Sequence, residues 1–289
     1  MLSRNIQIQW ACSSAEAAGL RNEGWCPVEC SFGAESITDA LLMDHHGSWS
    51  HLESVALRAL RDASAARRED PRFVVTGAAD ADATFAIAAL AGLLPEPLAQ
   101  WLPLAHRIAA ADIGVIPLDP ELREDGLLLL WKQLSSGVQD GCAFHAGVDR
   151  WRWLTAGVPE MLLRTVADAE SHRQCAARAA PMERISKEVV LVSSAKGWGF
   201  DVWYAEVAPV VVAWQEGRVT VGVRDQETAR QLFGPEGLGA VYSKLEPPGW
   251  GGRPSVGGSP RGGQLDFATA RAAAAAIAAA VCPSVNDLP

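Results

Sequence analysis

A short apolar strand, an acidic loop and an apolar helix follow one another closely, and this unit constrains the fold more than any other feature. The strand is Phe73–Thr76, the loop carries Asp80 and Asp82, and the helix is Ala83–Leu94, which ends at Pro95. A strand that leads directly into a helix is the building unit of α/β proteins with parallel sheets. Ligands bind at the carboxyl ends of strands in such sheets, so the sequence predicts a binding site near this loop.

The pattern along the rest of the chain divides it in two. From Pro97 to about residue 180 the apolar residues recur mostly at helical spacing, whereas short apolar runs typical of strands dominate from residue 189 onward. We expect an α/β protein with a parallel-sheet N-terminal domain that carries a helical insert (residues 1–185) and a smaller α/β C-terminal domain (residues 186–289). The other expected strands are Ile6–Trp10, Val28–Phe32, Ala40–Met43, Val189–Ser193, Val202–Trp214 and Arg218–Val223.

The charge balance limits the partners of the chain. There are 25 Lys and Arg residues and 34 Asp and Glu residues, which gives a formal net charge of −9. Long duplex nucleic acid needs a basic face and is not expected as a partner, whereas a small phosphate ligand is compatible because a metal can supply positive charge. No apolar run reaches the length of about 18 residues that a membrane span needs. The six scattered cysteines suggest reduced thiols and a cytoplasmic location.

A histidine cluster follows the expected strand Ala40–Met43. Asp44, His45 and His46 are consecutive, and with His51 they place three of the six histidines within seven positions. Carboxylate and imidazole together suit Mn²⁺, Fe²⁺ or Zn²⁺, whereas carboxylates alone suit Mg²⁺. The sequence therefore predicts a metal site here, and the alternative is a polar turn whose imidazoles cap the following helix.

The acidic pair of the first loop also has two interpretations. Asp80 and Asp82, separated by one alanine, can address two metal ions or two faces of one ion. The alternative is an ordinary helix N-cap, for which Asp is a preferred residue. One cap needs only one of the two acids, so the pair favours a functional site.

A glycine-rich stretch at residues 249–263 forms the third candidate. Its glycines allow close approach of the backbone to a ligand, and consecutive N–H groups can bind an anion. Arg253 and Arg261 add donors for phosphate, and Trp250 could stack on a base or sugar. The alternative is a flexible linker, which seldom carries tryptophan and arginine in this pattern.

Together the three candidates resemble the DHH phosphoesterase superfamily. Its members include family II inorganic pyrophosphatases, a single-strand exonuclease, nanoRNA hydrolases and cyclic-dinucleotide phosphodiesterases. Residues 44–46 match the Asp-His-His triplet of the family, and residues 80–83 match its Asp-x-Asp-Ala run between a strand and a helix. Residues 251–253 are similar to the Gly-Gly-basic loop of its C-terminal substrate domain, with Arg where His is usual.

The resemblance implies a metal-dependent hydrolase of phosphoester or phosphoanhydride bonds, acting on a small phosphorylated substrate or a short nucleotide. It implies two Mn²⁺ or Mg²⁺ ions, with His46 as a further ligand or in contact with the phosphate, and Asp44 orienting the histidines. A homodimer of the chain is possible under this resemblance. The implied metal ligands are His45, Asp80, Asp82 and a further carboxylate, for which Asp112 is the nearest candidate and Asp39 another. The implied substrate-binding residues are Gly251, Gly252, Arg253, Gly257, Gly258 and Arg261.

Two departures from the family keep other interpretations open. The triplet precedes the Asp-x-Asp-Ala run in this chain, which implies a permuted or divergent member. Thr76 stands where the family has a metal-binding histidine, so His51 or His106 would have to replace it. The alternative function is a non-catalytic descendant that binds a nucleotide or phosphate. An unrelated enzyme with a single metal at His45, His46 and His51, and an interaction protein that uses exposed tryptophans, are the remaining alternatives.

Overall fold

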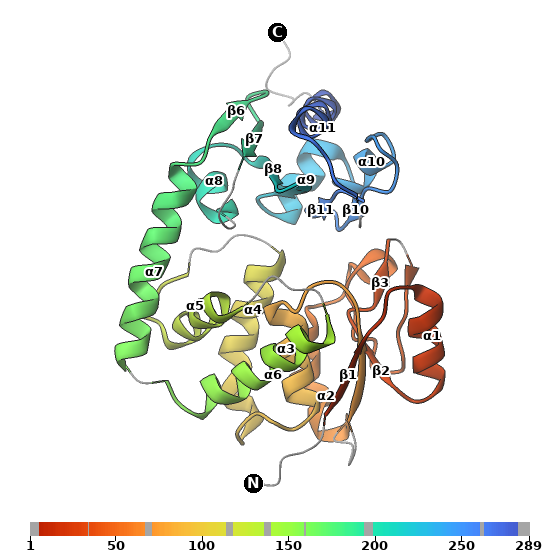
Figure 1. Ribbon diagram of the computed structural model, residues 1–289, viewed down its shortest axis with the longest axis vertical. Coiled ribbons are helices and arrows are strands. Elements are labelled where there is room, and N and C mark those ends of the chain that lie inside the picture. Colours follow the sequence, from red (N-terminus) through yellow and green to blue (C-terminus); the bar gives the residue numbers. More distant parts are fainter. Residues whose placement is uncertain are drawn as a thin grey trace. The chain divides into compact units, whose positions relative to one another are not determined.

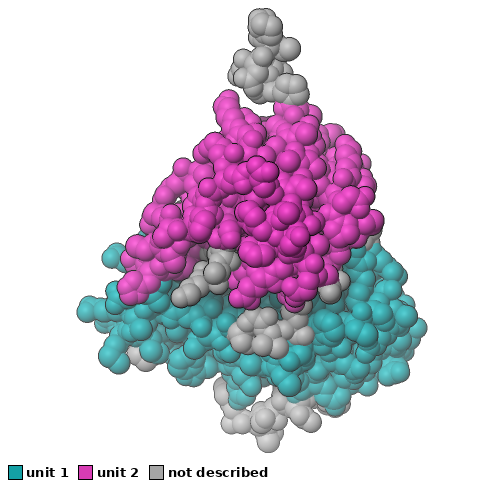
Figure 2. Space-filling view, turned by 45° about the horizontal axis from the view of Figure 1, so that its top comes forward, with its two compact units in different colours: residues 1–112, 118–169 teal, residues 113–117, 170–289 magenta. Residues whose placement is uncertain are grey.

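The computed structural model describes residues 6–33, 35–66, 71–113, 118–135, 140–158, 160–193, 199–260 and 263–282. The chain forms two compact units, coloured separately in Figure 2. The N-terminal unit comprises residues 1–112 and 118–169, and the C-terminal unit comprises residues 113–117 and 170–289. Both units are mixed α/β structures, as the sequence predicts (Figure 1).

The N-terminal unit is built on a parallel three-stranded sheet in the order β1-β5-β2. Alternate side chains of the central strand point to opposite faces, so Phe73 and Val75 pack with α2 and α3, while Val74 packs on the side of α1. The sheet is therefore covered on both faces (Figure 1). Its strands are β1 (Gln7–Trp10), β2 (Cys26–Val28) and β5 (Arg72–Val75), and the covering helices are α1 (Ser14–Asn22), α2 (Val55–Ala66) and α3 (Ala81–Leu90).

Further helices of this unit pack onto α3. Trp151 of α6 donates its indole N–H to Oγ1 of Thr84 at 3.0 Å, and Gly147 leaves space for the same threonine. Arg107 of α4 pairs with the buried Asp125 of α5 at 2.5 Å, which ties these helices together. The bounds are η2 (Leu98–Trp101), α4 (Leu102–Ile113), α5 (Arg123–Leu134), α6 (Gly141–Ala156) and α7 (Glu160–Arg178); between β2 and α2 lie β3 (Ser31–Phe32), β4 (Glu35–Ser36) and η1 (Gly47–Trp49).

The C-terminal unit contains a six-stranded sheet in the order β10-β11-β9-β8-β7-β6. Only the β7–β8 pair is parallel among these described strands. Val190 and Val211 face α8, whereas Val189 and Val210 face the core formed with α9, α10 and α11. The bounds are β6 (Met182–Arg184), β7 (Val189–Ser193), α8 (Phe200–Glu206), β8 (Val210–Gln215), β9 (Arg218–Val223), α9 (Gln226–Phe233), α10 (Gly239–Tyr242), β10 (Gly251–Gly252), β11 (Val256–Gly258) and α11 (Phe267–Ala280).

Three expected strands are wrong. Residues 28–32 are not one strand, because β2 ends at Val28 and β3 begins at Ser31. Residues 40 and 41 lie in a turn and residues 42 and 43 have no regular structure, because Asp39 accepts hydrogen bonds from the backbone N–H groups of Leu41 and Leu42. Residues 202–214 are not one strand but the end of α8 followed by β8. The first part is helical because its apolar side chains repeat at helical spacing, and Trp203 anchors that face by donating to the carbonyl of Ala177 at 2.8 Å.

The division between the units falls within α7, earlier than the expected boundary at residue 185. β6 lies before that expected boundary and pairs with β7, so it belongs to the C-terminal sheet. The second half of α7 is held to the same unit by the ion pair of Arg173 with Asp201, at 2.5 Å. The boundary therefore lies earlier than expected because of contacts between segments distant in sequence, which local periodicity does not reveal.

None of the helices in the described part of the chain combines the length and hydrophobicity that crossing a bilayer requires.

Candidate metal centre

One imidazole nitrogen is surrounded by carboxylates at the carboxyl edge of the N-terminal sheet. Nε2 of His45 lies 2.7 Å from Oε1 of Glu29, 3.1 Å from Oδ2 of Asp82 and 3.4 Å from Oδ2 of Asp112. His45 is 2 % exposed. A single nitrogen carries at most one proton and cannot hydrogen-bond to all three carboxylates at once. The arrangement therefore resembles a set of metal ligands more than a set of hydrogen bonds.

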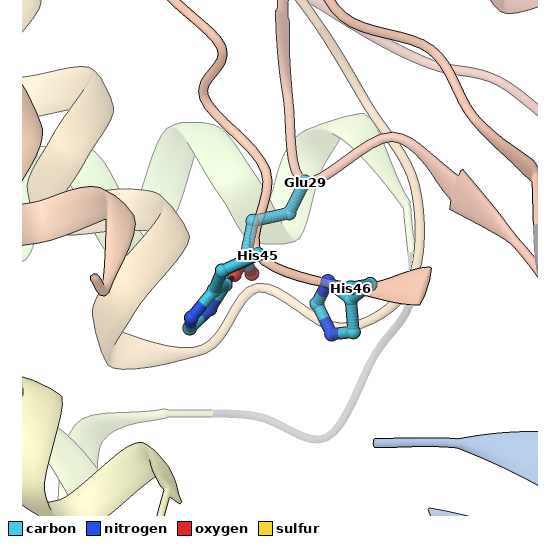
Figure 3. A group of neighbouring side chains, drawn as sticks. All are labelled: Glu29, His45 and His46. Carbon is cyan, nitrogen blue, oxygen red and sulfur yellow. Dashed lines mark hydrogen bonds and ion pairs between the residues drawn. The ribbon is translucent and has the colours of Figure 1, made fainter. Parts of the chain in front are cut away.

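Two overlapping groups of these side chains have the spacing of metal ligands. Glu29, His45 and His46 form one, and His45, Asp82 and Asp112 form the other, with the ligand atoms of each group within 4.8 Å of one another. Figure 3 shows the first group, in which the Glu29 side chain extends toward His45 while the His46 ring lies to one side. Both groups use His45, which makes it the central residue of the candidate centre.

Glu29 is the residue that the sequence analysis missed. It directly follows β2, at the carboxyl end of a parallel strand, and is buried with a positive φ of 51°. The expected strand Val28–Phe32 places Glu29 inside a strand, and a residue inside a strand is not a candidate for a site formed by loops. The rule that ligands gather at strand ends would have identified it once β2 was known to end at Val28.

Asp82 joins the centre to the N-terminus of α2. Its Oδ1 accepts from Ser54 Oγ at 2.6 Å and from the Ala56 N–H at 2.9 Å, and its Oδ2 accepts from the Val55 N–H at 3.1 Å. Burial acts to raise the pKa of Asp82, but His45 and these donors outweigh it, so the pKa is lowered. Asp82 is thus a carboxylate that stays ionised in the protein interior.

Asp80 caps its own helix, as the alternative interpretation predicts. Its Oδ1 accepts from the Ala83 N–H at 2.9 Å, at the start of α3. Burial and the negative charges of Glu29, Asp112 and Asp82 raise the pKa of Asp80 well above its usual value. Asp80 therefore lies near the same acidic cluster, although it belongs to neither ligand group. Both acids of the pair cap helices, Asp80 on α3 and Asp82 on α2.

Asp112 comes from the last turn of α4. A carboxylate at a helix C-terminus faces the negative end of the helix dipole, which disfavours it by about 0.3–1 kcal/mol. Its place beside His45 and Asp82 adds a further negative charge to the cluster. A bound cation would offset both effects.

Asp44 orients His46 rather than His45. Oδ1 of Asp44 lies 2.8 Å from Nδ1 of His46 and accepts the backbone N–H of His46 at 3.0 Å, while Oδ2 accepts from Ser36 Oγ. Burial acts to raise the pKa of Asp44, but its contacts with His46 and Ser36 outweigh it and the pKa is lowered. The carboxylate fixes the tautomer in which Nδ1 of His46 carries a proton, and the side chain of His46 stays 26 % exposed.

The donor set fits a divalent cation. Mixed carboxylate and imidazole ligands suit Mn²⁺, Fe²⁺ or Zn²⁺. Four carboxylates lie in this cluster, from Glu29, Asp80, Asp82 and Asp112. The guanidinium of Arg58 supplies one positive charge near them, and burial lowers its pKa although the charges of Asp82, Asp44 and Glu29 raise it. Buried like charges at this spacing disfavour ionisation, so a divalent ion would stabilise the ionised cluster.

The other histidines and the second carboxylate candidate lie apart from both ligand groups among the described residues. His51 is exposed in a turn, and His106 is exposed on α4. Asp39 instead shapes its own turn by accepting the Leu41 N–H at 2.8 Å. Thr76 is buried at the end of β5, and Glu29 occupies the neighbouring strand end. The single-metal arrangement of His45, His46 and His51 is therefore not one of the ligand groups.

The glycine-rich stretch forms a hairpin of the C-terminal sheet rather than an open loop. Gly251 and Gly252 of β10 pair with Gly258 and Gly257 of β11, and β11 also pairs with β9. A Cβ atom on Gly257 would lie 2.1 Å from the Tyr242 hydroxyl, which explains that glycine by packing.

Trp250 packs in the core beneath this hairpin, so its expected stacking on a base is wrong. Arg253 is buried in the turn between the two strands, where its carbonyl accepts the Tyr242 hydroxyl at 2.9 Å. Arg261 lies outside the described residues. The role of this stretch in substrate binding stays a prediction.

Comparison with protein-family models and with curated proteins gives no match to this chain. The candidate centre therefore stands on its residues and their geometry.

Proposed function

We propose that the chain is a divalent-metal-dependent phosphohydrolase, a permuted or divergent relative of the DHH phosphoesterases. The observation that carries the proposal is the position of His45 Nε2, within 3.4 Å of carboxylate oxygens from Glu29, Asp82 and Asp112. His45 and Asp82 come from the two segments that resemble the family motifs, and Glu29 supplies a donor where Thr76 replaces the family histidine. The ion we propose is Mn²⁺ or Mg²⁺, and the number we propose is two.

The proposed ligands are His45, Glu29, Asp82 and Asp112, with Asp80 alongside. A divalent ion held by these residues would polarise a phosphoryl oxygen and lower the pKa of a water molecule. The protein contributes charged groups, most of them buried, whose positions are fixed by the N-termini of α2 and α3, the ends of β2 and β5 and the last turn of α4.

His46 is the proposed proton donor to the leaving group. Asp44 holds the proton on Nδ1, so Nε2 of His46 is the nitrogen that can give or take a proton. The partial exposure of His46 allows contact with a ligand, whereas His45 is buried. The proposed substrate is a small phosphorylated compound or a short nucleotide, because a chain of net charge −9 does not favour long polynucleotides.

The test combines metal binding with hydrolysis. Metal-free protein is titrated with Mn²⁺ by calorimetry, and phosphate or nucleotide release is then measured from pyrophosphate and from a dinucleotide. We expect Mn²⁺-dependent turnover that Asp82→Asn removes and that His46→Gln lowers by about 10²–10⁴-fold without weakening Mn²⁺ binding. Asp140→Asn is the matched control, because Asp140 caps α6 in the same unit away from the ligand groups.

Phosphate binding without hydrolysis is the second candidate function. The absence of imidazole at Thr76 and the capping roles of Asp80 and Asp82 favour it. Tight Mn²⁺ and nucleotide binding with no turnover would support this candidate, whereas a chain that binds no divalent ion would contradict both.

A further inference from the structure

The guanidinium of Arg58, on α2, donates hydrogen bonds to the backbone just before His45. Nη1 donates to the carbonyl of Leu42, Nη2 donates to the carbonyl of Asp44 at 2.8 Å, and Nε donates to the carbonyl of Glu53 at 3.1 Å. Arg58 is 8 % exposed. Across the described residues, each hydrogen bond of this guanidinium ends on a backbone carbonyl, although three carboxylates are close enough to affect its pKa.

The carbonyl between these two is also held. Met43 accepts the backbone N–H of Glu29 at 2.8 Å. The three consecutive carbonyls of residues 42–44 therefore bind either Arg58 or the backbone at the end of β2. These hydrogen bonds form a clamp on residues 42–44. The next residue is His45, so the direction of its side chain depends on this clamp.

The clamped segment has a backbone that needs support. Leu42 has a φ of 52° and Glu29 a φ of 51°, a region that residues other than glycine rarely adopt. Such conformations persist where surrounding contacts over-determine them, and they occur often at functional sites. The planar fork of arginine meets this need because it holds two carbonyls in fixed geometry, which a lysine ammonium does not.

The charge of Arg58 has the opposite effect on a metal site. A positive charge beside bound Mn²⁺ repels the ion, so charge alone would weaken metal binding. By contrast, the placement of the His45 side chain by Arg58 would strengthen metal binding. The two roles therefore predict changes of opposite sign when Arg58 is replaced by a neutral residue.

We propose that Arg58 is a positioning residue, whose guanidinium holds the carbonyls of Leu42 and Asp44 so that the His45 imidazole faces the carboxylates of the candidate centre. The inference rests on the metal centre of the proposed function and is independent of hydrolysis.

The first experiment needs no metal. Amide hydrogen exchange is measured by NMR for the Glu29 N–H, which binds the carbonyl inside the clamp. We expect exchange about tenfold or more faster in Arg58→Gln, because local opening becomes easier, and an intermediate rate in Arg58→Lys. The Ala11 N–H, bound to the Val75 carbonyl at 2.8 Å, reports on the sheet and stays unchanged.

The second experiment uses Mn²⁺ as the probe. Affinity is measured by calorimetry, and imidazole coordination by the nitrogen coupling in the electron spin echo of bound Mn²⁺. We expect Arg58→Gln to weaken binding by about 10–100-fold, the usual effect of losing a group that orients a ligand, and to lose the nitrogen signal. Arg58→Lys restores part of both. Arg61→Gln is the control, because Arg61 lies on the same helix with an exposed side chain paired to Glu53.

The outcomes separate the two proposals. Tighter Mn²⁺ binding with an intact nitrogen signal in Arg58→Gln overturns the positioning role. A wild-type chain that binds no Mn²⁺ contradicts the proposed function, and amide exchange still decides the role of Arg58: an unchanged rate at Glu29 overturns it. If Arg58→Gln does not fold, both experiments are done with Arg58→Lys. If that variant has the amide exchange rate and the nitrogen coupling of the wild type, the proposal that the guanidinium is needed is overturned.

Discussion

Oδ2 of Asp82 lies 3.1 Å from Nε2 of His45, and the same carboxylate accepts the first backbone N–H groups of α2. One side chain of α3 therefore connects a helix N-terminus to the candidate metal centre. Because a helix N-terminus stabilises a negative charge, Asp82 stays ionised while buried beside His45. This relationship makes Asp82 the residue whose replacement affects stability and metal binding together.

Asp82→Asn will weaken Mn²⁺ binding by at least about tenfold and lower the free energy of unfolding by about 1–3 kcal/mol. The amide keeps the volume but loses the charge that the N–H groups and His45 stabilise. Calorimetry and urea unfolding measure the two effects. Asp140→Asn, the matched cap on α6, keeps wild-type Mn²⁺ affinity. Equal Mn²⁺ affinity in Asp82→Asn and wild type would exclude Asp82 as a ligand.

Glu29→Gln will weaken Mn²⁺ binding and stabilise the metal-free protein. Removing one charge relieves repulsion among the buried carboxylates, and we expect a gain of about 0.5–2 kcal/mol, as when other strained functional sites are relieved. The unfolding free energy is measured in a chelator and the affinity by calorimetry. Glu160→Gln, whose side chain is 85 % exposed in the same unit, is the control and changes neither quantity. A metal-free protein destabilised by Glu29→Gln would show that Glu29 serves structure instead.

Mn²⁺ will stabilise the N-terminal unit selectively. An ion that binds only the folded state raises the free energy of unfolding by about 2.7 kcal/mol at a hundredfold excess over its Kd. Hydrogen exchange read by mass spectrometry separates the two units, and a chelator reverses the effect. Equal protection of the C-terminal unit would indicate a different binding site.

Gly257→Ala will destabilise the C-terminal unit by about 1–3 kcal/mol through overpacking. The added Cβ would lie 2.1 Å from the Tyr242 hydroxyl and 2.6 Å from the Gly251 carbonyl oxygen. Gly251→Ala, in the paired strand, has nothing within 4 Å of its added Cβ and is the matched control. Tryptophan fluorescence during urea unfolding compares the two variants, and equal midpoints would disprove the packing role of Gly257.

Acid will weaken the cap of α9. Burial acts to raise the pKa of Asp225, but its bonds to the Thr228 N–H at 2.7 Å and hydroxyl at 2.9 Å outweigh this, so the pKa is lowered. A carboxyl whose pKa is lower in the folded state than in the unfolded state stabilises the fold at pH values above its unfolded-state pKa. This stability is lost as the pH falls through its folded-state pKa.

The C-terminal unit will therefore lose stability below about pH 4, and Asp225→Asn will lose less, because its cap carries no titrating charge. Unfolding midpoints of both proteins between about pH 3 and pH 6 measure the difference. Parallel pH profiles would contradict the role of this carboxylate.

Local sequence pattern determined the strand–loop–helix unit around residues 73–90 and the β7 and β9 strands. Each depends on an apolar pattern, and the helix also on its capping aspartate, which act over a few neighbouring residues. The same pattern indicated His45 and Asp82 individually, whereas Asp112 was a candidate only through the resemblance to a known family. The expected strands at 28–32, 40–43 and 202–214 are wrong because apolar composition alone does not distinguish a strand from a turn or a helix.

Only the tertiary structure decided which of these side chains meet. Glu29 joins the centre because β2 ends at Val28 beside β5, and Asp112 joins it because α4 ends near His45. The glycine-rich hairpin joins the C-terminal sheet for the same reason, since β9, the partner of β11, lies more than thirty residues earlier in the chain. Residue chemistry is local, whereas convergence depends on strand pairing and helix packing between segments that are distant in sequence.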